Sequence, residues 1–227
     1  YRDIGFLPDA VINYLLLLGW SLDGHTEEFT REQMIEQFSL ERVVKSPASF
    51  DPQKLLAFQE RLMDQQTAET KTALALPYLV QSERVANPPA EAELDQLDKI
   101  VQAAGDRLKI GGDILDYTEF YASDDTFAYD PKAFQKRLVK PPEARQLLSD
   151  FQVQLNQLED FSTVSVEQTL RDFVEQQQIK MGQLIHALRV AVTGKPVGFG
   201  LFETMAILGK DRCLKRLSRT LAEMETE

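Results

Sequence analysis

The sequence predicts an all-α protein, and three observations support this fold class. Apolar residues recur with the spacing of an amphipathic helix through most of the 227 residues. Strand signals are few, because residues 127–129 and 163–166 are short runs without a hairpin partner. Side chains that typically begin helices precede several of the apolar runs, namely Thr30, Asp51, Asp130 and Ser165.

The first predicted helices lie near the start of the chain. Pro8 opens a segment whose apolar residues cover most of a helix surface, so we expect this helix to be well buried. Thr30 and Gln33 have the spacing of a capping box at the start of a second helix. Asp51 followed by Pro52 forms an N-cap and first-turn pair for a third.

Further helices are predicted beyond a breaker cluster at residues 87–89, where one asparagine precedes two prolines. A helical pattern follows this cluster over residues 91–104. Asp130 precedes another proline, and Ser165 has capping-box spacing ahead of an apolar run. A last helix is predicted at about residues 210–222.

Length and composition suit a globular chain of one large domain or two smaller ones. The breaker cluster favours two domains, residues 1–85 and 86–227, with a soft boundary at 82–90. No segment reaches the roughly 18 apolar residues of a membrane span, and the first residues do not resemble a signal peptide. The single cysteine, Cys213, excludes an internal disulfide and fits a reducing compartment, so we expect a cytoplasmic protein.

The sequence contains no arrangement typical of a catalytic or metal-binding site. His25 and His186 are the only histidines, and Cys213 is distant from both in sequence. No cluster has the spacing of a zinc or iron site, and no Gly-rich loop carries the lysine of a phosphate cradle. We therefore expect no catalytic residue, metal or cofactor in this chain, and a self-contained helical enzyme is disfavoured.

Residues 180–220 are strongly basic in an acidic protein. They carry a formal charge of +6, whereas the whole chain carries −11. A local positive face predicts a polyanionic partner, although a solvated C-terminal helix with basic residues would give the same composition. Internal neutralisation of these arginines by carboxylates would contradict the proposal of an RNA-binding cationic face. The basic residues are Lys180, Arg189, Lys195, Lys210, Arg212, Lys215, Arg216 and Arg219.

Two blocks of sequence resemble bacterial-type glutamyl-tRNA synthetases. The first is YRDIGFLPDAVINYLLLLGWS at residues 1–21, continued by Phe29-Thr30, Phe38–Val43, Ser46–Asp51 and Lys54-Leu55. The second comprises KMG at 180–182, LRVAVTG at 188–194, GLFE at 200–203 and LGK at 208–210. The blocks stand in the family's order, and residues 60–160 match more weakly. The resemblance implies a helical stem-contact domain followed by an all-helical anticodon-binding domain.

The same resemblance implies that the family's catalytic domain, with both ATP-binding signatures, lies upstream of Tyr1. The intact family member would use ATP and Mg to attach glutamate to tRNA-Glu. This chain would hold and check the tRNA, and we expect it to be inactive alone.

Arg189 and Leu201 fall where residues of the family contact the anticodon, and Arg107 falls near another arginine that reads the anticodon end. A guanidinium forks onto a base edge or phosphate, or stacks on a loop base. A surface ion pair for Arg189 and core packing for Leu201 are the structural alternatives. The candidate RNA-contacting residues are therefore Arg189, Leu201, Arg107, Lys195, Lys210, Arg212, Lys215, Arg216 and Arg219.

The chain departs from the family pattern at four positions. Ala187 and Phe199 replace prolines, and Ala57 and Gln59 stand where the family tends to show Trp and Asn. These departures leave two other identities open: a synthetase-like protein-interaction module without an RNA role, and part of a hybrid enzyme that charges glutamine.

Overall fold

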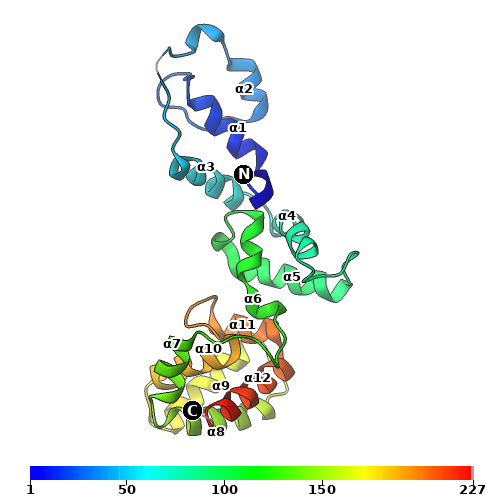
Figure 1. Ribbon diagram of the computed structural model, residues 1–227, viewed down its shortest axis with the longest axis vertical. Coiled ribbons are helices and arrows are strands. Elements are labelled where there is room, and N and C mark those ends of the chain that lie inside the picture. Colours follow the sequence, from blue (N-terminus) through cyan, green and yellow to red (C-terminus); the bar gives the residue numbers. More distant parts are fainter. Residues whose placement is uncertain (46, 226–227) are drawn as a thin grey trace. The chain divides into compact units, whose positions relative to one another are not determined.

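The computed structural model describes residues 1–45 and 47–225, and within them it consists of helices and loops (Figure 1). The described residues form no strand, and a single isolated antiparallel bridge joins Trp20 to Val43. The all-α fold class is thus confirmed. No described helix is long and apolar enough to cross a membrane. Ser46, part of one resembling block, lies outside the described residues.

The chain divides into two compact units, Tyr1–Asp116 (unit 1) and Tyr117–Glu227 (unit 2). We predicted a domain boundary at residues 82–90 instead. Compactness and function need not divide a chain at the same residue, so the functional domains 1–85 and 86–227 remain a prediction.

The described residues of unit 1 form five α-helices and four short 3₁₀ turns (Figure 1). The α-helices are α1 (Pro8–Leu17), α2 (Arg31–Gln37), α3 (Pro52–Asp64), α4 (Ala68–Gln81) and α5 (Glu91–Ala104). The 3₁₀ turns are η1 (Arg2–Ile4), η2 (Leu40–Arg42), η3 (Gly105–Arg107) and η4 (Gly111–Asp116). Helices α1 and α3 pack on each other, and α4 packs on both α5 and η4.

The N-caps of α2 and α3 follow the sequence prediction. Thr30 and Gln33 form both hydrogen bonds of the capping box, because each side chain accepts from the other residue's backbone N–H. The Asp51 carboxylate accepts from the N–H groups of Gln53 and Lys54 at the start of α3. These bonds satisfy backbone donors that have no partner within the helix.

Gln59, one of the departures from the family pattern, has a structural role. Its side chain is fully buried, accepts a hydrogen bond from the N–H of Leu7 at 2.7 Å and donates one to the carbonyl of Lys109 at 2.8 Å. It therefore ties α3 to two distant segments of unit 1 and lies in no contact surface.

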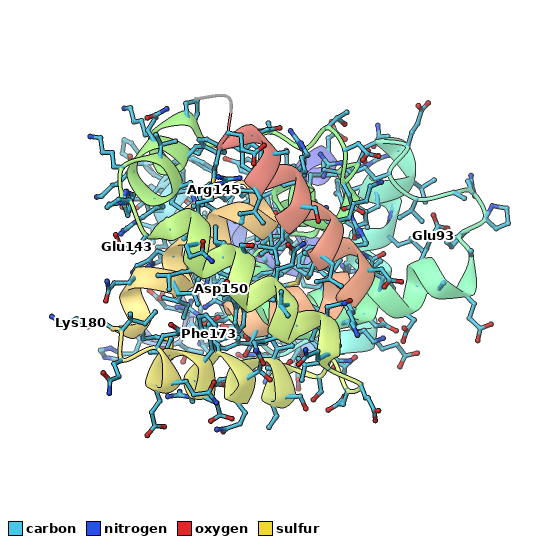
Figure 2. The ribbon with its side chains drawn as sticks, turned by 90° about the horizontal axis from the view of Figure 1, so that it is seen from below. Glu93, Glu143, Arg145, Asp150, Phe173 and Lys180 are labelled. Carbon is cyan, nitrogen blue, oxygen red and sulfur yellow. The ribbon has the colours of Figure 1, made fainter. Side chains whose placement is uncertain are left out.

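Unit 2 is a helical bundle formed mainly by its later helices (Figure 1). The elements are α6 (Thr118–Tyr121), α7 (Pro131–Phe134), the π-helix η5 (Gln135–Val139), α8 (Ala144–Gln157), α9 (Thr163–Gln176), α10 (Met181–Thr193), α11 (Leu201–Leu208) and α12 (Lys210–Glu223). Helix α8 packs on α9, α10 and α12, and η5 packs on α8 and α10. Figure 2 shows Phe173 of α9 directed toward α8, where its ring lies 5.4 Å from that of Phe151.

The structure corrects one local prediction in unit 2, because Ser165 is not the N-cap of its helix. The N-cap of α9 is Ser162, whose hydroxyl accepts from the N–H of Ser165, so residues 163–166 are helical rather than extended. Asp160 reinforces this start by accepting hydrogen bonds from the Ser162 N–H and hydroxyl. Residues 127–129, the other strand signal, form a loop.

Candidate nucleic-acid interface

Most of the basic residues predicted to contact RNA are held by partners inside unit 2. Eight of the nine candidates belong to unit 2, and Arg107 is exposed in η3 of unit 1. Helix α12 begins immediately after Gly209 and presents one face to the bundle and to the loop that follows α6. The orientation of each basic side chain on α12 therefore decides whether that side chain can contact a ligand outside unit 2.

Arg216 is an interior residue, with 0% of its side chain exposed. Its Nε donates to the Asp124 carboxylate at 2.6 Å, and its terminal nitrogens donate to the carbonyls of Val192 at 2.7 Å and Glu119 at 2.8 Å. The guanidinium also lies 4.7 Å from the Phe127 ring. The Arg216 side chain thus presents no surface to an external ligand in this structure.

Arg212 and Arg219 are also committed to the fold. Arg212 shares the Asp124 carboxylate at 3.1 Å and donates to the carbonyl of Phe120 at 2.9 Å. Arg219 donates to the carbonyl of Phe127 at 2.8 Å and pairs with Glu223 at 2.8 Å. Both side chains are less than one-third exposed. The predicted cationic face of α12 is therefore largely neutralised internally.

Burial raises the pKa of the Asp124 carboxyl, but hydrogen bonds and positive charge from Arg212 and Arg216 outweigh this effect. The net result is a pKa below the ordinary value of 3.8. Asp124 therefore remains ionised and compensates the buried charge of Arg216.

The three lysines differ in how firmly they are held. Lys195 pairs at 2.7 Å with Glu119, whose side chain is only 4% exposed. Lys210 donates to the carbonyl of Leu158 at 2.7 Å, at the C-terminal end of α8. Lys215 pairs with Asp125, but both side chains are more than half exposed, so this contact is weak and exchanges readily with solvent.

Arg189 retains unused hydrogen-bonding capacity. It is half-buried on α10, and its Nη1 donates to the carbonyl of Phe199 at 2.7 Å. Among the described residues this is its one hydrogen bond, although a guanidinium has five N–H donors. Burial lowers the pKa of Arg189, and the carboxylates of Glu203 and Glu119 oppose that shift.

Leu201 packs into the core, as its structural alternative predicted. It is 2% exposed at the first turn of α11, directly after the loop that carries Phe199. Phe199 is equally buried against the rings of Tyr117 and Phe120. Phe199, which stands where the family has proline, therefore anchors this loop through its ring, and its backbone carbonyl accepts the hydrogen bond from Arg189.

Arg189 belongs to a group of basic residues on η5 and α10 whose other members the sequence analysis did not propose as RNA contacts. His186 and Arg189 are three positions apart on α10, which packs on η5. Burial lowers the pKa of His186, and the charges of Arg137, Arg189 and Lys136 lower it further. The charges that lower this pKa are all positive, so we treat these residues as one cationic group. We define the cationic cluster as Lys136, Arg137, His186 and Arg189.

The basic residues of α7, η5 and the turn that follows are unpaired. Within residues 1–45 and 47–225, none of their side chains forms a hydrogen bond or an ion pair. The signal was present in the sequence, because residues 131–142 contain four Lys or Arg and no Asp or Glu. These residues are Lys132, Lys136, Arg137 and Lys140.

The other reactive groups of the described chain are not arranged for chemistry. Cys213 is fully buried on α12, and burial raises the pKa of its thiol to about 12. No group of three or more His, Cys, Asp or Glu among the described residues could hold a metal ion.

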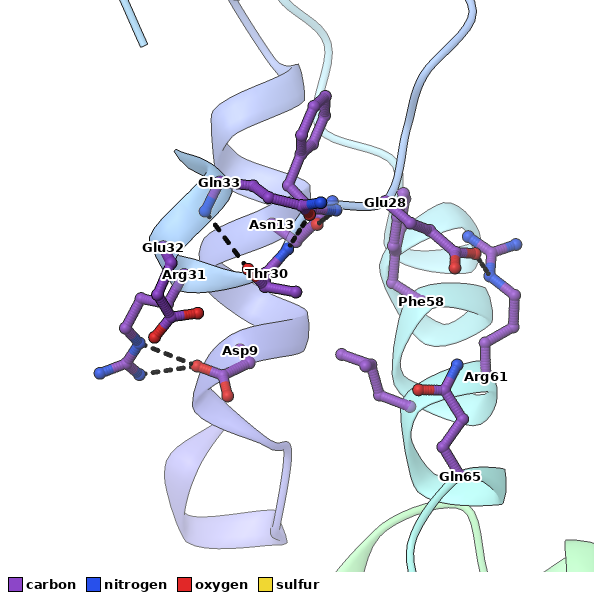
Figure 3. Close-up of a pocket in the computed structure, with 12 residues that line it drawn as sticks. Asp9, Asn13, Glu28, Thr30, Arg31, Glu32, Gln33, Phe58, Arg61 and Gln65 are labelled. Atoms are coloured by element: carbon purple, nitrogen blue, oxygen red, sulfur yellow. Dashed lines mark hydrogen bonds and ion pairs between the residues drawn. The ribbon is translucent and has the colours of Figure 1, made fainter. Parts of the chain in front are cut away.

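The pocket between α1 and α3, about 390 Å³ in volume, has its charged rim closed by ion pairs (Figure 3). Arg31 donates to Asp9 at 2.7 Å, and Arg61 pairs with Glu28 at 2.7 Å. The Arg61 guanidinium also lies 4.6 Å from the Phe58 ring. Two of the cations that line the pocket are therefore already paired with carboxylates of its own lining.

Two family models match the sequence. Residues 70–221 match the anticodon binding domain, and residues 1–57 match the catalytic domain of class I tRNA synthetases (E and Q). The first match covers unit 2 almost entirely, including α7, η5 and α10.

Several curated proteins are similar over nearly the whole chain. The glutamate–tRNA ligase of Moorella thermoacetica is 37% identical over 219 residues, which are 96% of this chain and 44% of that protein. The glutamate–tRNA ligase of Roseiflexus castenholzii is 38% identical over 222 residues, 98% of this chain and 44% of that protein. The chain thus spans less than half the length of these relatives.

The fold is also found in solved structures. A crystal structure of a glutamate tRNA ligase from Elizabethkingia meningosepticum, in complex with its amino acid, superposes with a TM-score of 0.85 at 24% identity. That superposition covers 99% of this chain and 43% of the solved one. A glutamate–tRNA synthetase from Elizabethkingia anophelis gives a TM-score of 0.81 at 23% identity, over 98% of this chain and 42% of that one. At this level of identity the likeness concerns the fold.

Proposed function

Because the chain belongs to the anticodon-binding-domain family, as the C-terminal region of a class I glutamate–tRNA ligase, we propose that it binds and positions tRNA-Glu for that ligase. The observation that supports this proposal is the family match over residues 70–221. The catalytic core is largely absent from the 227 residues, since the catalytic-domain model matches residues 1–57 alone. ATP and Mg would act in that core, in the cytoplasm, and the chain alone would not aminoacylate.

The cationic cluster is the surface that we propose for the RNA. Phosphates attract Lys and Arg, and release of their counterions favours binding. Lys136 and Arg137 have no partner to give up among the described residues, whereas Arg212 and Arg216 would have to break internal bonds. Association therefore favours the unpaired residues, and Lys132 and Lys140 extend the same basic segment.

Arg189 is the residue that we propose to meet a base. Its remaining donors are not engaged within the described residues, and the cluster around it holds the backbone phosphates nearby. Arg107 remains a predicted contact from unit 1. Leu201 supports the start of α11 by packing, and Lys195, Lys210, Arg212, Arg216 and Arg219 stabilise the bundle.

The test is a titration of fluorescein-labelled tRNA-Glu with the 227-residue chain, followed by fluorescence anisotropy in about 0.1 M salt. Replacing Lys136 and Arg137 by Gln together is expected to weaken binding about tenfold, because two phosphate contacts are lost. Arg171→Gln is the matched control, since Arg171 is exposed on α9 and pairs within its own helix.

Equal affinity of the double variant and the wild type would remove the cationic cluster from the interface. Preference for tRNA-Gln over tRNA-Glu would favour the glutamine-charging alternative. Absence of any tRNA binding, with RNA-free capture of a protein partner, would favour the interaction module. Attachment of glutamate to tRNA by the chain alone would contradict the proposal that aminoacylation needs the catalytic core.

A further inference from the structure

Three exposed lysines in α7, η5 and the turn that follows are spaced four residues apart. They are Lys132, Lys136 and Lys140. Phe134 and Leu138 of the same segment are buried in the bundle. The lysines therefore share the outer face of this segment, and we call the three of them the lysine ladder.

The π-helix η5 keeps these lysines on one face. Residues four positions apart in a regular α-helix are about 40° out of line, because the helix repeats every 3.6 residues. Within Gln135–Val139 the chain is wound more widely, and the N–H of Lys140 donates to the carbonyl of Gln135, five positions earlier, at 2.9 Å. Four residues then make less than a full turn, so the second step reverses the drift of the first. Such π-helical turns are rare and are frequently found at functional sites.

The charges of the lysine ladder are not compensated within the described part of the chain. Its side chains form no hydrogen bond or ion pair there, and residues 131–142 contain no Asp or Glu. The two flanking carboxylates have other partners. Asp130 accepts from the N–H of Ala133 at 2.7 Å, and Glu143 accepts from the side chain of Gln183 at 3.2 Å. The ladder therefore presents three free positive charges to a ligand.

The spacing of the ladder suits a polyanion with one charge in each repeat. Four residues advance about 6 Å along a helix, so the three charges span about 12 Å. This step is comparable with the separation of successive phosphates along one RNA strand. Lysine acts on a phosphate as a flexible point charge, and phosphate contacts carry no sequence information. Proteins that bind single strands without sequence preference likewise follow the backbone with a row of cations.

We propose that the lysine ladder binds three successive phosphates of one unpaired RNA strand. This inference rests on the proposed function and deepens it, because it adds a sequence-independent backbone contact to the base contact of Arg189. The ladder shares Lys136 with the cationic cluster, so a strand held by the ladder also reaches the cluster.

Two other polyanionic surfaces suit the ladder less well. Helices that lie on membranes place large apolar side chains beside their basic ones. None of the exposed large apolar residues lies within residues 131–142, which the structure describes in full. Domains that bind double-stranded RNA contact two successive minor grooves over about 16 base pairs. The ladder is a single row of about 12 Å, which is shorter than such a span.

The test is a titration of fluorescein-labelled oligouridine of about nine nucleotides with the 227-residue chain, followed by anisotropy in about 0.05 M salt. The ladder variant carries Lys132→Gln and Lys140→Gln, and it leaves the cationic cluster intact. The charge-matched variant adds Gln154→Lys and Asn156→Lys, which restore the net charge at exposed positions of α8.

Both variants are expected to bind oligouridine about tenfold more weakly than the wild type, because each loses two phosphate contacts. Oligocytidine of the same length should be weakened equally. Since the replaced lysines are exposed, the packing of unit 2 is retained in both variants.

Wild-type affinity of the charge-matched variant would overturn the proposal, because net charge alone would then account for binding. A large preference for oligouridine over oligocytidine would overturn it as well, since the contact would then involve bases. A loss confined to phosphatidylserine vesicles, or to an RNA duplex of about 16 base pairs, would assign the ladder to that surface instead.

A separate titration of tRNA-Glu with the wild type distinguishes this inference from the proposed function. If the wild type binds tRNA-Glu while the variants keep their affinity for oligouridine, the lysine ladder alone is excluded. If the wild type does not bind tRNA-Glu, the proposed function fails.

Discussion

At the scale of single residues, the two neighbouring aspartates Asp124 and Asp125 show how context decides the role of a charge. The Asp124 side chain is 15% exposed and forms ion pairs with Arg212 and Arg216. The Asp125 side chain is 67% exposed and forms an ion pair with the exposed Lys215. The first pair is a buried interaction and the second a surface ion pair.

We therefore expect Asp124→Asn to lower the free energy of unfolding by about 3 kcal/mol, because Arg216 would keep its buried charge without a counterion. Asp125→Asn should change it by less than about 0.5 kcal/mol. Urea unfolding of both variants at neutral pH measures this difference. Equal effects would contradict the structural role of Asp124.

The pH dependence of the same variant has a defined sign. Since the pKa of Asp124 lies below 3.8, its contribution to stability is present above that pH and is lost as pH falls through the folded pKa. The deficit of Asp124→Asn should thus be constant near neutrality and shrink in acid.

The sequence shows that residues 180–220 are basic, but it did not reveal that several of their arginine side chains point into the fold. The acceptors of Arg216 include Asp124 and the carbonyl of Glu119, which are 92 and 97 positions away in the sequence. A helical pattern on α12 alone cannot reveal partners at that separation. The cationic segment 131–142, by contrast, was visible in the composition and was overlooked.

At the scale of elements, helices with local start signals were predicted well. The caps at Thr30 and Asp51 follow from short-range hydrogen bonds, and residues 91–104 form α5 as expected. Helix α4 was missed because it contains Pro77, which removes one backbone donor. Its packing against α5 and η4 outweighs that loss.

The turn after α10 provides a prediction at this scale. Gly194 has φ +75°, and an added Cβ would collide with the carbonyl oxygen of Ala128. Gly24 has a similar φ of +80° but open space around it. Gly194→Ala should therefore cost about 3 kcal/mol, from backbone strain together with the collision, and Gly24→Ala only about 1 kcal/mol. Thermal unfolding of the two variants decides, and similar melting temperatures would contradict the geometry.

At the scale of the whole molecule, a net charge of −11 restricts RNA binding to local surfaces. Electrostatic attraction is screened beyond roughly 8–10 Å at physiological salt, so the acidic remainder opposes a docked contact only weakly. The affinity for tRNA should consequently be modest and depend strongly on salt.

We assume that each of the four unpaired Lys and Arg side chains of residues 131–142 contacts one phosphate. A plot of the logarithm of the binding constant against the logarithm of the salt concentration should then have a slope of about −3 to −4. Anisotropy titrations at several salt concentrations measure this slope. The variant lacking Lys136 and Arg137 should show a shallower slope, by about 1.5. A slope near zero for the wild type would exclude phosphate contacts of this kind.

The burial of Cys213 has a practical consequence for spectroscopy. A thiol whose pKa is about 12 and whose side chain is enclosed does not react with maleimides at neutral pH in the native protein. Because the chain has no other cysteine, a pair of engineered surface cysteines, one in each unit, would accept donor and acceptor dyes without background labelling. Energy transfer between them would then report directly how the arrangement of the two units responds when tRNA is added.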